Sequence, residues 1–174
     1  MERWHPTVTR LLTEEHINCY DNPMQHSIQV RVPFADIDLS GRIHFSAMMR
    51  YMDVAEHELM RTLGLPRVTT FPELEFPRVH ASCDYHRAIS YNDDLTIISQ
   101  IIRVGRSSWT VSFTSFYAHE LTEMGPEASK PATSGQLIIV AIDKQTGRST
   151  PLPDELRAVL VAQLESSNQD TPAK

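Results

Sequence analysis

Residues 34–45, FADIDLSGRIHF, join two segments with different hydrophobic periods. In the preceding segment, SIQVRVPF (27–34), apolar and polar side chains alternate, which predicts a β-strand ending near Pro33. In the following segment, residues 46–63, apolar side chains recur at helical spacing and Gly64 follows, which predicts an α-helix about 27 Å long. The apolar stripe of this helix consists of Met48, Met52, Ala55, Leu59 and Leu63. The quoted stretch is therefore expected to form a turn between a strand and the start of a long helix.

Only strands are predicted over most of the remaining chain. Four segments are rich in β-branched and aromatic residues, and a short helix follows near the C-terminus. The strand segments are RVHASCDYH (78–86), LTIISQIIRV (95–104), SWTVSFTSFY (108–117) and GQLIIVAID (135–143). Consecutive strands imply an antiparallel sheet, so the expected class is α+β, with the sheet curled around the single long helix.

The chain is predicted to contain one folded domain. Its expected parts are an N-terminal extension (1–26), the domain (27–164) and a disordered tail (165–174). The polar link 119–132 is longer than an ordinary hairpin loop and is expected to be mobile.

The composition limits the possible functions. The chain has 174 residues, of which 41% are hydrophobic and 22% charged, so it is long enough for one globular domain with a core. The net charge is −6 and no basic run is present, which argues against nucleic acid as a partner. Two cysteines without a CxxC pair argue against a disulfide framework or a zinc cluster. With no long apolar stretch and no secretory signal pattern, we expect a cytoplasmic protein without a membrane partner.

No metal site is predicted either. His80 and His86 share a strand face, but they lie six residues apart, which is roughly 20 Å along a strand. They cannot reach one ion without another element.

Two kinds of site resemble the quoted stretch only in part. A calcium loop needs oxygen ligands at positions 1, 3 and 5, glycine at 6 and a bidentate Glu at 12. Asp36, Asp38, Ser40 and Gly41 satisfy the first half of this pattern, but position 12 is Ala47 and the incoming segment is a strand. Phosphoryl transfer through an Asp-x-Asp motif is usually carried on a parallel sheet, which the strands after residue 75 do not predict.

The third kind is a carboxylate beside the start of a helix. The first N–H groups of the helix lack internal partners and carry a partial positive charge, so they favour an oxyanion. Asp38 would lie beside them as a nucleophile or general base for attack on a carbonyl carbon. A carboxylate is a weak base, so the leaving group must be good, and a thiolate qualifies because its thiol has a pKa of about 8.5. Spacing alone also allows Asp36 and Asp38 to be simple cap or turn residues.

The segment 30–64, VRVPFADIDLSGRIHFSAMMRYMDVAEHELMRTLG, resembles the opening motif of the hotdog-fold acyl-CoA thioesterases, in the 4-hydroxybenzoyl-CoA thioesterase-like family. RAISYNDDLTI (87–97), GRSSWTVSF (105–113) and STPLPDELRAVL (149–160) resemble later parts of it, so the similarity covers roughly residues 28–160. It implies a hotdog fold, in which a curved antiparallel sheet wraps around one long central helix. It also implies a homodimer or homotetramer with sites at the subunit interface.

The resemblance also implies roles for individual residues. Asp38 falls on the catalytic carboxylate, Gly41 on the turn glycine, and Phe45 or its neighbour on the backbone N–H that polarises the carbonyl. Some relatives have a histidine at the position of Phe45, so His44, one place earlier, is a further catalytic candidate. Arg103 and Arg106 flank a turn where relatives place basic residues, and they are the predicted contacts to the CoA phosphates.

The main hypothesis is an acyl-CoA thioesterase that needs no cofactor, since CoA is part of the substrate. Alternatives are a hotdog enzyme acting on carrier-protein thioesters or as a dehydratase, and a non-catalytic acyl-CoA binding protein. Glu56 is a second candidate carboxylate, because other hotdog branches use a helix Glu, but an ordinary solvated or capping charge is favoured since Asp38 fits the catalytic position. Arg78 and Arg87 are alternative phosphate contacts.

Overall fold

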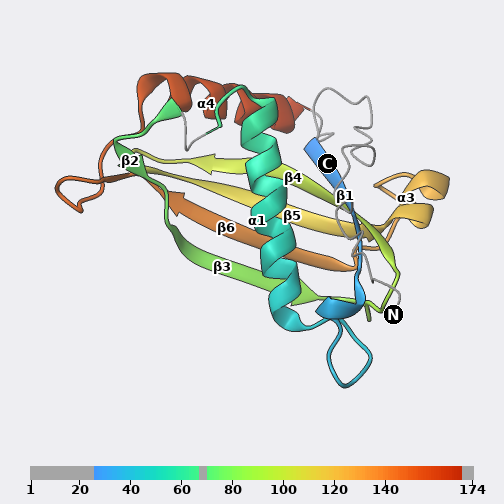
Figure 1. The fold of residues 1–174 in the computed structure, drawn as a ribbon. Helices are drawn as coiled ribbons and strands as arrows, with labels where there is room; N and C mark the ends of the chain where they lie inside the picture. The colour runs from blue at the N-terminus through green and yellow to red at the C-terminus, as the bar shows by residue number, and fades with distance from the viewer. Residues whose placement is uncertain (1–25, 67–69, 170–174) are drawn as a thin grey trace, which may run out of the picture.

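One long helix lies across a curved antiparallel sheet (Figure 1). The computed structural model describes residues 26–66 and 70–169, so the predicted N-terminal extension lies outside the described residues apart from His26. The elements are β1 (His26–Arg31), η2 (Phe34–Asp36), α1 (Phe45–Thr62), β2 (Leu74–Glu75), β3 (Arg78–Tyr85), β4 (Asp94–Val104), β5 (Ser108–Tyr117), α3 (Ala118–Met124), β6 (Thr133–Val140), β7 (Ile142–Asp143) and α4 (Asp154–Gln169). None of the described helices is both long and apolar enough to cross a membrane.

The main sheet has five strands in the order β1-β4-β5-β6-β3, and each pair is antiparallel. Register shifts interrupt the ladders between Ile101 and Arg103 on β4 and between Arg78 and His80 on β3. Irregularities of this kind bend a strand and increase its twist, which helps the sheet to curve around α1. The predicted α+β class, with a helix against an antiparallel sheet, is confirmed.

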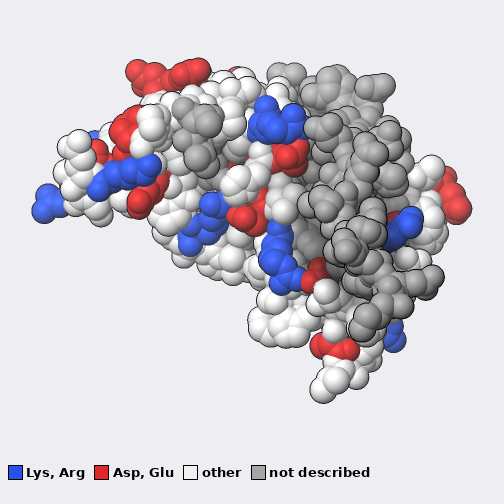
Figure 2. Space-filling view, in the orientation of Figure 1, with Lys and Arg blue, Asp and Glu red and all other residues white. Residues whose placement is uncertain are grey.

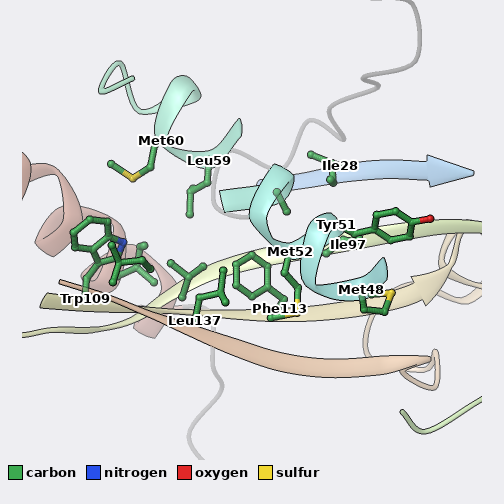
Figure 3. Packing of buried hydrophobic residues seen from close by; sticks show 14 of the residues in the cluster. Ile28, Met48, Tyr51, Met52, Leu59, Met60, Ile97, Trp109, Phe113 and Leu137 are labelled. Atoms are coloured by element: carbon green, nitrogen blue, oxygen red, sulfur yellow. The ribbon is translucent and has the colours of Figure 1, made fainter. Parts of the chain in front are cut away.

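The core lies between α1 and the sheet (Figure 3). Met48 and Met52 on α1 are buried, and Met52 points towards Phe113 of the sheet, with Leu137 further along the same core. The helix lies close to the sheet at Gly135 on β6, where an added Cβ would lie 3.1 Å from the Met52 methyl group. Helix and sheet therefore pack tightly at the middle of α1, which fixes the position of both helix ends.

The two edges of the sheet differ. β1 pairs with the first part of β4, Asp94–Ser99, and α4 also packs against β4, with Leu156 and Leu160 fully buried. At the other edge, β3 pairs with β6 on one side, and within the described ranges no strand pairs with its outer side.

Two segments are more ordered than the sequence predicts. The first part of the expected mobile loop (119–132) belongs to α3 (Ala118–Met124), which Arg87 holds through a bidentate ion pair with Glu120 (2.6 and 2.7 Å). The expected disordered tail is helical as far as Gln169, because α4 continues beyond Leu164, its last apolar position. A helix that is already packed gains one hydrogen bond for each residue added, so it extends past its apolar stripe.

Candidate active site

The segment between β1 and α1 forms a small hairpin that projects beyond the start of α1 (Figure 1). The N–H of His44 donates to the carbonyl of Asp36 at 2.7 Å. The N–H of Asp38 donates to the carbonyl of Arg42 at 2.8 Å. Gly41 closes the turn, with its N–H 3.0 Å from the Asp38 carbonyl and φ of 75°, a conformation that favours glycine. The hairpin is thus a defined structure that presents Asp38 near its tip.

Asp36 anchors the base of this hairpin. Its carboxylate is buried and accepts hydrogen bonds from the Tyr51 hydroxyl (2.6 Å) and from the Arg50 guanidinium. Burial and this hydrogen bond to Asp36 raise the pKa of Tyr51, so the phenol stays protonated and remains a donor. Asp36 is therefore a structural residue, as one of the two interpretations of the motif predicts.

Asp38 differs from Asp36 in that its side chain is exposed. Oδ1 accepts two hydrogen bonds from Ser40, one from the hydroxyl at 2.5 Å and one from the backbone N–H at 2.7 Å. These bonds hold the pKa of Asp38 below its ordinary value, with a weaker contribution from His44. The backbone of Arg42 makes a weaker contribution, and no side chain in the described part of the chain donates to Oδ2. The carboxylate is thus charged at neutral pH, with one oxygen occupied by the turn and the other open to a reactant.

The start of α1 offers one open backbone donor. His44 caps the helix, because its Nδ1 accepts the N–H of Ser46 at 3.3 Å and its carbonyl accepts the N–H of Ala47 at 2.9 Å. No acceptor among the described residues is hydrogen-bonded to the N–H of Phe45. The hydroxyl of Tyr85 at the end of β3 donates to the Phe45 carbonyl at 2.5 Å, which fixes this first turn. Of the two predicted donors, Phe45 and its neighbour, Phe45 is the one that is open.

The open oxygen and the open N–H belong to the same junction. Arg42 pairs with Asp38 across the hairpin and precedes Phe45 by three residues, so the backbones of Asp38 and Phe45 lie at most about 15 Å apart. Exposed rings surround the junction, namely Phe34 (75% exposed), Phe45 (68%) and Tyr91 (59%). The rings of Phe34 and Tyr91 meet edge to face at 6.0 Å. In a single chain these three aromatic rings are therefore exposed to solvent.

The predicted CoA contacts lie far from this junction. Arg31 of β1, just before the hairpin, pairs with Asp94 at the start of β4, and Arg103 lies nine residues further along the same strand, roughly 30 Å away. Arg106 follows in the turn between β4 and β5. Within one chain, Arg103 and Arg106 are therefore at the opposite end of the sheet, and they can share a site with Asp38 only between two copies.

Other basic side chains lie at the hairpin end of the sheet. Arg42 is exposed and donates to the Ser90 hydroxyl at 2.6 Å. Arg87, an alternative phosphate contact from the sequence, is occupied by Glu120 and lies over the Tyr117 ring at 4.4 Å. Arg42 was not singled out by the sequence, because its neighbourhood depends on pairing across the hairpin.

Glu56 belongs to a buried charged cluster further along α1. Its side chain is 0% exposed and accepts a hydrogen bond from Arg78 on β3 at 2.9 Å, so it is not the solvated charge considered above. The same guanidinium nitrogen lies 2.6 Å from Asp53. Asp53, Glu56 and His57 place potential metal-ligand atoms within 4.8 Å of one another, but Arg78 lies among them and disfavours a second cation. Figure 2 shows acidic and basic side chains intermingled in this region, without a broad patch of one sign on the displayed face.

Comparisons with known proteins agree with this architecture. The model of the thioesterase superfamily matches residues 40–116, which begin two residues after Asp38. A 1,4-dihydroxy-2-naphthoyl-CoA hydrolase from Synechococcus elongatus is 25% identical over 135 residues, covering 76% of this chain and 92% of the relative.

Two solved structures share the fold. A 1,4-dihydroxy-2-naphthoyl-CoA thioesterase from Synechocystis has a TM-score of 0.67 and 18% identity, covering 79% of this chain and 96% of its own. A Staphylococcus aureus protein, solved in complex with CoA, has a TM-score of 0.68 and 13% identity, covering 86% of this chain and 87% of its own. The predicted hotdog fold is confirmed.

Proposed function

We propose that this chain hydrolyses the thioester bond of an acyl-CoA, with Asp38 as nucleophile or general base, because residues 40–116 match the thioesterase superfamily and the relative from Synechococcus elongatus is named as a CoA hydrolase. The observation that carries the proposal is the junction of hairpin and helix, where an exposed carboxylate oxygen and an open helix N–H lie on one short segment. No described side chain donates to Oδ2 of Asp38 or accepts from this N–H.

In the proposed reaction, the thioester carbonyl lies between Asp38 and Phe45. Oδ2 of Asp38 attacks the carbonyl carbon, or takes a proton from a water molecule that attacks it. The developing negative charge on the carbonyl oxygen is stabilised by the N–H of Phe45 and the positive end of α1. CoA leaves as a thiolate, which needs no strong acid because its thiol has a pKa of about 8.5. If Asp38 is the nucleophile, water then cleaves the mixed anhydride and restores the carboxylate.

We propose an aromatic acyl group. The relative from Synechococcus elongatus and the structure from Synechocystis are both named for 1,4-dihydroxy-2-naphthoyl-CoA. The exposed rings of Phe34, Phe45 and Tyr91 beside the hairpin are suited to pack against a planar acyl group.

We further propose that a second copy of the chain completes the site, in a homodimer or homotetramer. The open surroundings of Asp38 and the unpaired outer side of β3 both support this proposal. In such an assembly, Arg103 and Arg106 of one copy could reach CoA held at the hairpin of another.

The test compares Asp38→Asn with Asp143→Asn. Asp143 is a matched control, because Thr146 donates to it from its N–H (2.7 Å) and hydroxyl (2.8 Å) in an exposed turn on another part of the chain. Hydrolysis is measured over aromatic, short-chain and long-chain acyl-CoAs and matching carrier-protein thioesters. We expect Asp38→Asn to lose at least about 100-fold in kcat and Asp143→Asn to retain activity. Turnover by folded Asp38→Asn within a few-fold of wild type would refute the assignment, and saturable binding without product in the wild type would indicate a binding protein.

A further inference from the structure

We infer that Ser40 is the positioning residue for the Asp38 carboxylate, fixing which oxygen reacts. The inference rests on the proposed function and deepens it, since it assigns a residue that acts through Asp38 without contacting the substrate. It is carried by the two hydrogen bonds that Ser40 donates to the same oxygen, Oδ1.

The geometry of these two bonds restricts the carboxylate. A carboxylate on a flexible side chain in solvent exchanges its two oxygens freely. Here the N–H and the hydroxyl of Ser40 both hold Oδ1, while the backbone bonds of Asp38 to Arg42 and Gly41 hold its main chain. Oδ2 receives no hydrogen bond from Ser40, so the two bonds to Oδ1 orient Oδ2 as the reacting atom before the substrate arrives.

The electrostatic consequence follows from the same contacts. The side-chain hydrogen bond from Ser40 is the largest cause that lowers the pKa of Asp38, followed by the backbone bond from Ser40. The other groups facing the carboxylate are the backbone of Arg42 and the ring of His44, and both contribute less. Because the reactive form is the charged carboxylate, activity is lost as the pH falls through the pKa of Asp38. Ser40 therefore keeps the enzyme active to lower pH.

The chain contains an internal comparison for this arrangement. Asp143 receives the same pair of donors from Thr146, and those contacts also lower its pKa, but Asp143 is the last residue of β7 and does not lie near the start of α1 in the sequence. A serine or threonine bonded to a turn aspartate is thus not a functional feature by itself. At Asp38 the serine–aspartate contact becomes a functional feature, because the second carboxylate oxygen lies at the junction with the open N–H of Phe45.

The experiment uses three variants of the full chain, Ser40→Ala, Ser40→Thr and Thr146→Ala. Ser40→Ala removes the hydroxyl and keeps the backbone bond, so the turn is retained. Ser40→Thr restores a hydroxyl. For each variant, the carboxyl carbons of Asp38 and Asp143 are titrated by NMR, and kcat/KM for an aromatic acyl-CoA is measured against pH.

In Ser40→Ala we expect the Asp38 titration and the acid limb of kcat/KM to move together to higher pH, and in Ser40→Thr to return towards wild type. Thr146→Ala should move the Asp143 titration and leave the pH–rate profile unchanged. Both Asp38 readouts coinciding with wild type in Ser40→Ala would overturn the role of Ser40. A shifted Asp38 titration with an unchanged rate profile would instead show that Asp38 is not the reacting carboxylate, so the proposed function would fail and the inference with it.

Discussion

The ion pair between Glu56 and Arg78 should be essential for stability, and replacing Arg78 with Met tests this directly. Methionine keeps an apolar stem and removes the charge, which leaves a carboxylate that is 0% exposed without its guanidinium partner. Removing one partner of a buried ion pair typically costs 3–5 kcal/mol, so we expect a loss of about 3 kcal/mol in the free energy of unfolding. For a chain of this length that corresponds to a fall in Tm of roughly 6–12 °C.

The reverse change should cost less. In Glu56→Gln, Arg78 keeps Asp53 at 2.6 Å and is 27% exposed, so water reaches it, and we expect a loss of about 1 kcal/mol. The double variant should be more stable than Arg78→Met alone, because it no longer contains a buried carboxylate that has lost its guanidinium partner. A double-mutant cycle on Glu56 and Arg78 should therefore give a favourable coupling free energy between the two side chains.

The assay is urea unfolding followed by circular dichroism at one fixed protein concentration, which controls for any oligomerisation. Arg61→Met is the matched control, since Arg61 pairs with the partly exposed Glu58 on the surface of α1 and should cost less than about 1 kcal/mol. If Arg78→Met were no more destabilising than Arg61→Met, the buried pair would not hold α1 to β3.

Two further predictions concern positions that hold α1 against the sheet. Gly135→Ala should destabilise the fold by about 1–3 kcal/mol in the same urea assay. The added Cβ would lie 2.4 Å from the Ser82 carbonyl oxygen, so one of the two strand backbones must shift. Unchanged stability would mean that β3 and β6 are not so closely packed there. Tyr85→Phe removes the hydrogen bond to the Phe45 carbonyl, so we expect kcat to fall several-fold with KM nearly unchanged and about 1 kcal/mol of stability to be lost. An unaltered kcat in Tyr85→Phe would show that the first turn of α1 stays in place without this bond.

The periodic segments of the fold could be predicted from the sequence. The stripe containing Met48 and Met52 predicts a helix over 46–63, and the observed α1 spans Phe45–Thr62. The alternation from Trp109 to Tyr117 predicts β5 in the same way. In α1 one face is buried and the other is not, so the burial pattern follows the helical period. In β5 the predicted face is buried from Trp109 to Ser115, but Thr110 and Phe116 on the other face are buried as well, which the alternation did not predict.

Elements held by single contacts could not be predicted. α3 has no strong apolar stripe, and its visible attachment is the pair between Glu120 and Arg87, residues distant in the sequence. The cluster of Glu56 and Arg78 is of the same kind, since nothing in the spacing of a helix glutamate and a strand arginine indicates that they meet. Such contacts depend on the packing of α1 against β3, which only the folded chain defines.

The candidate site lies between these two cases. The motif identified the turn and its two aspartates, but local spacing predicted neither the hairpin pairing nor which aspartate is buried. The difference is made by Arg50 and Tyr51, which lie on the first turns of α1 and turn Asp36 inward. Asp38, at the hairpin tip, has no such partner on the helix and remains exposed.

The two contacts between α1 and β3 should have separable effects. The Tyr85 hydroxyl donates to the carbonyl of Phe45, the first residue of α1, whose own N–H is open. Arg78 instead binds Glu56, which lies eleven residues or about 16 Å further along the helix. A change at Arg78 should therefore lower stability while folded protein keeps its kcat, and a change at Tyr85 should lower kcat for a smaller loss of stability. Because both residues lie on β3, this edge strand connects the stability of the fold to the position of the proposed oxyanion donor. If both variants lowered kcat equally in fully folded protein, α1 would shift as one rigid unit, and the donor would not be positioned locally by Tyr85.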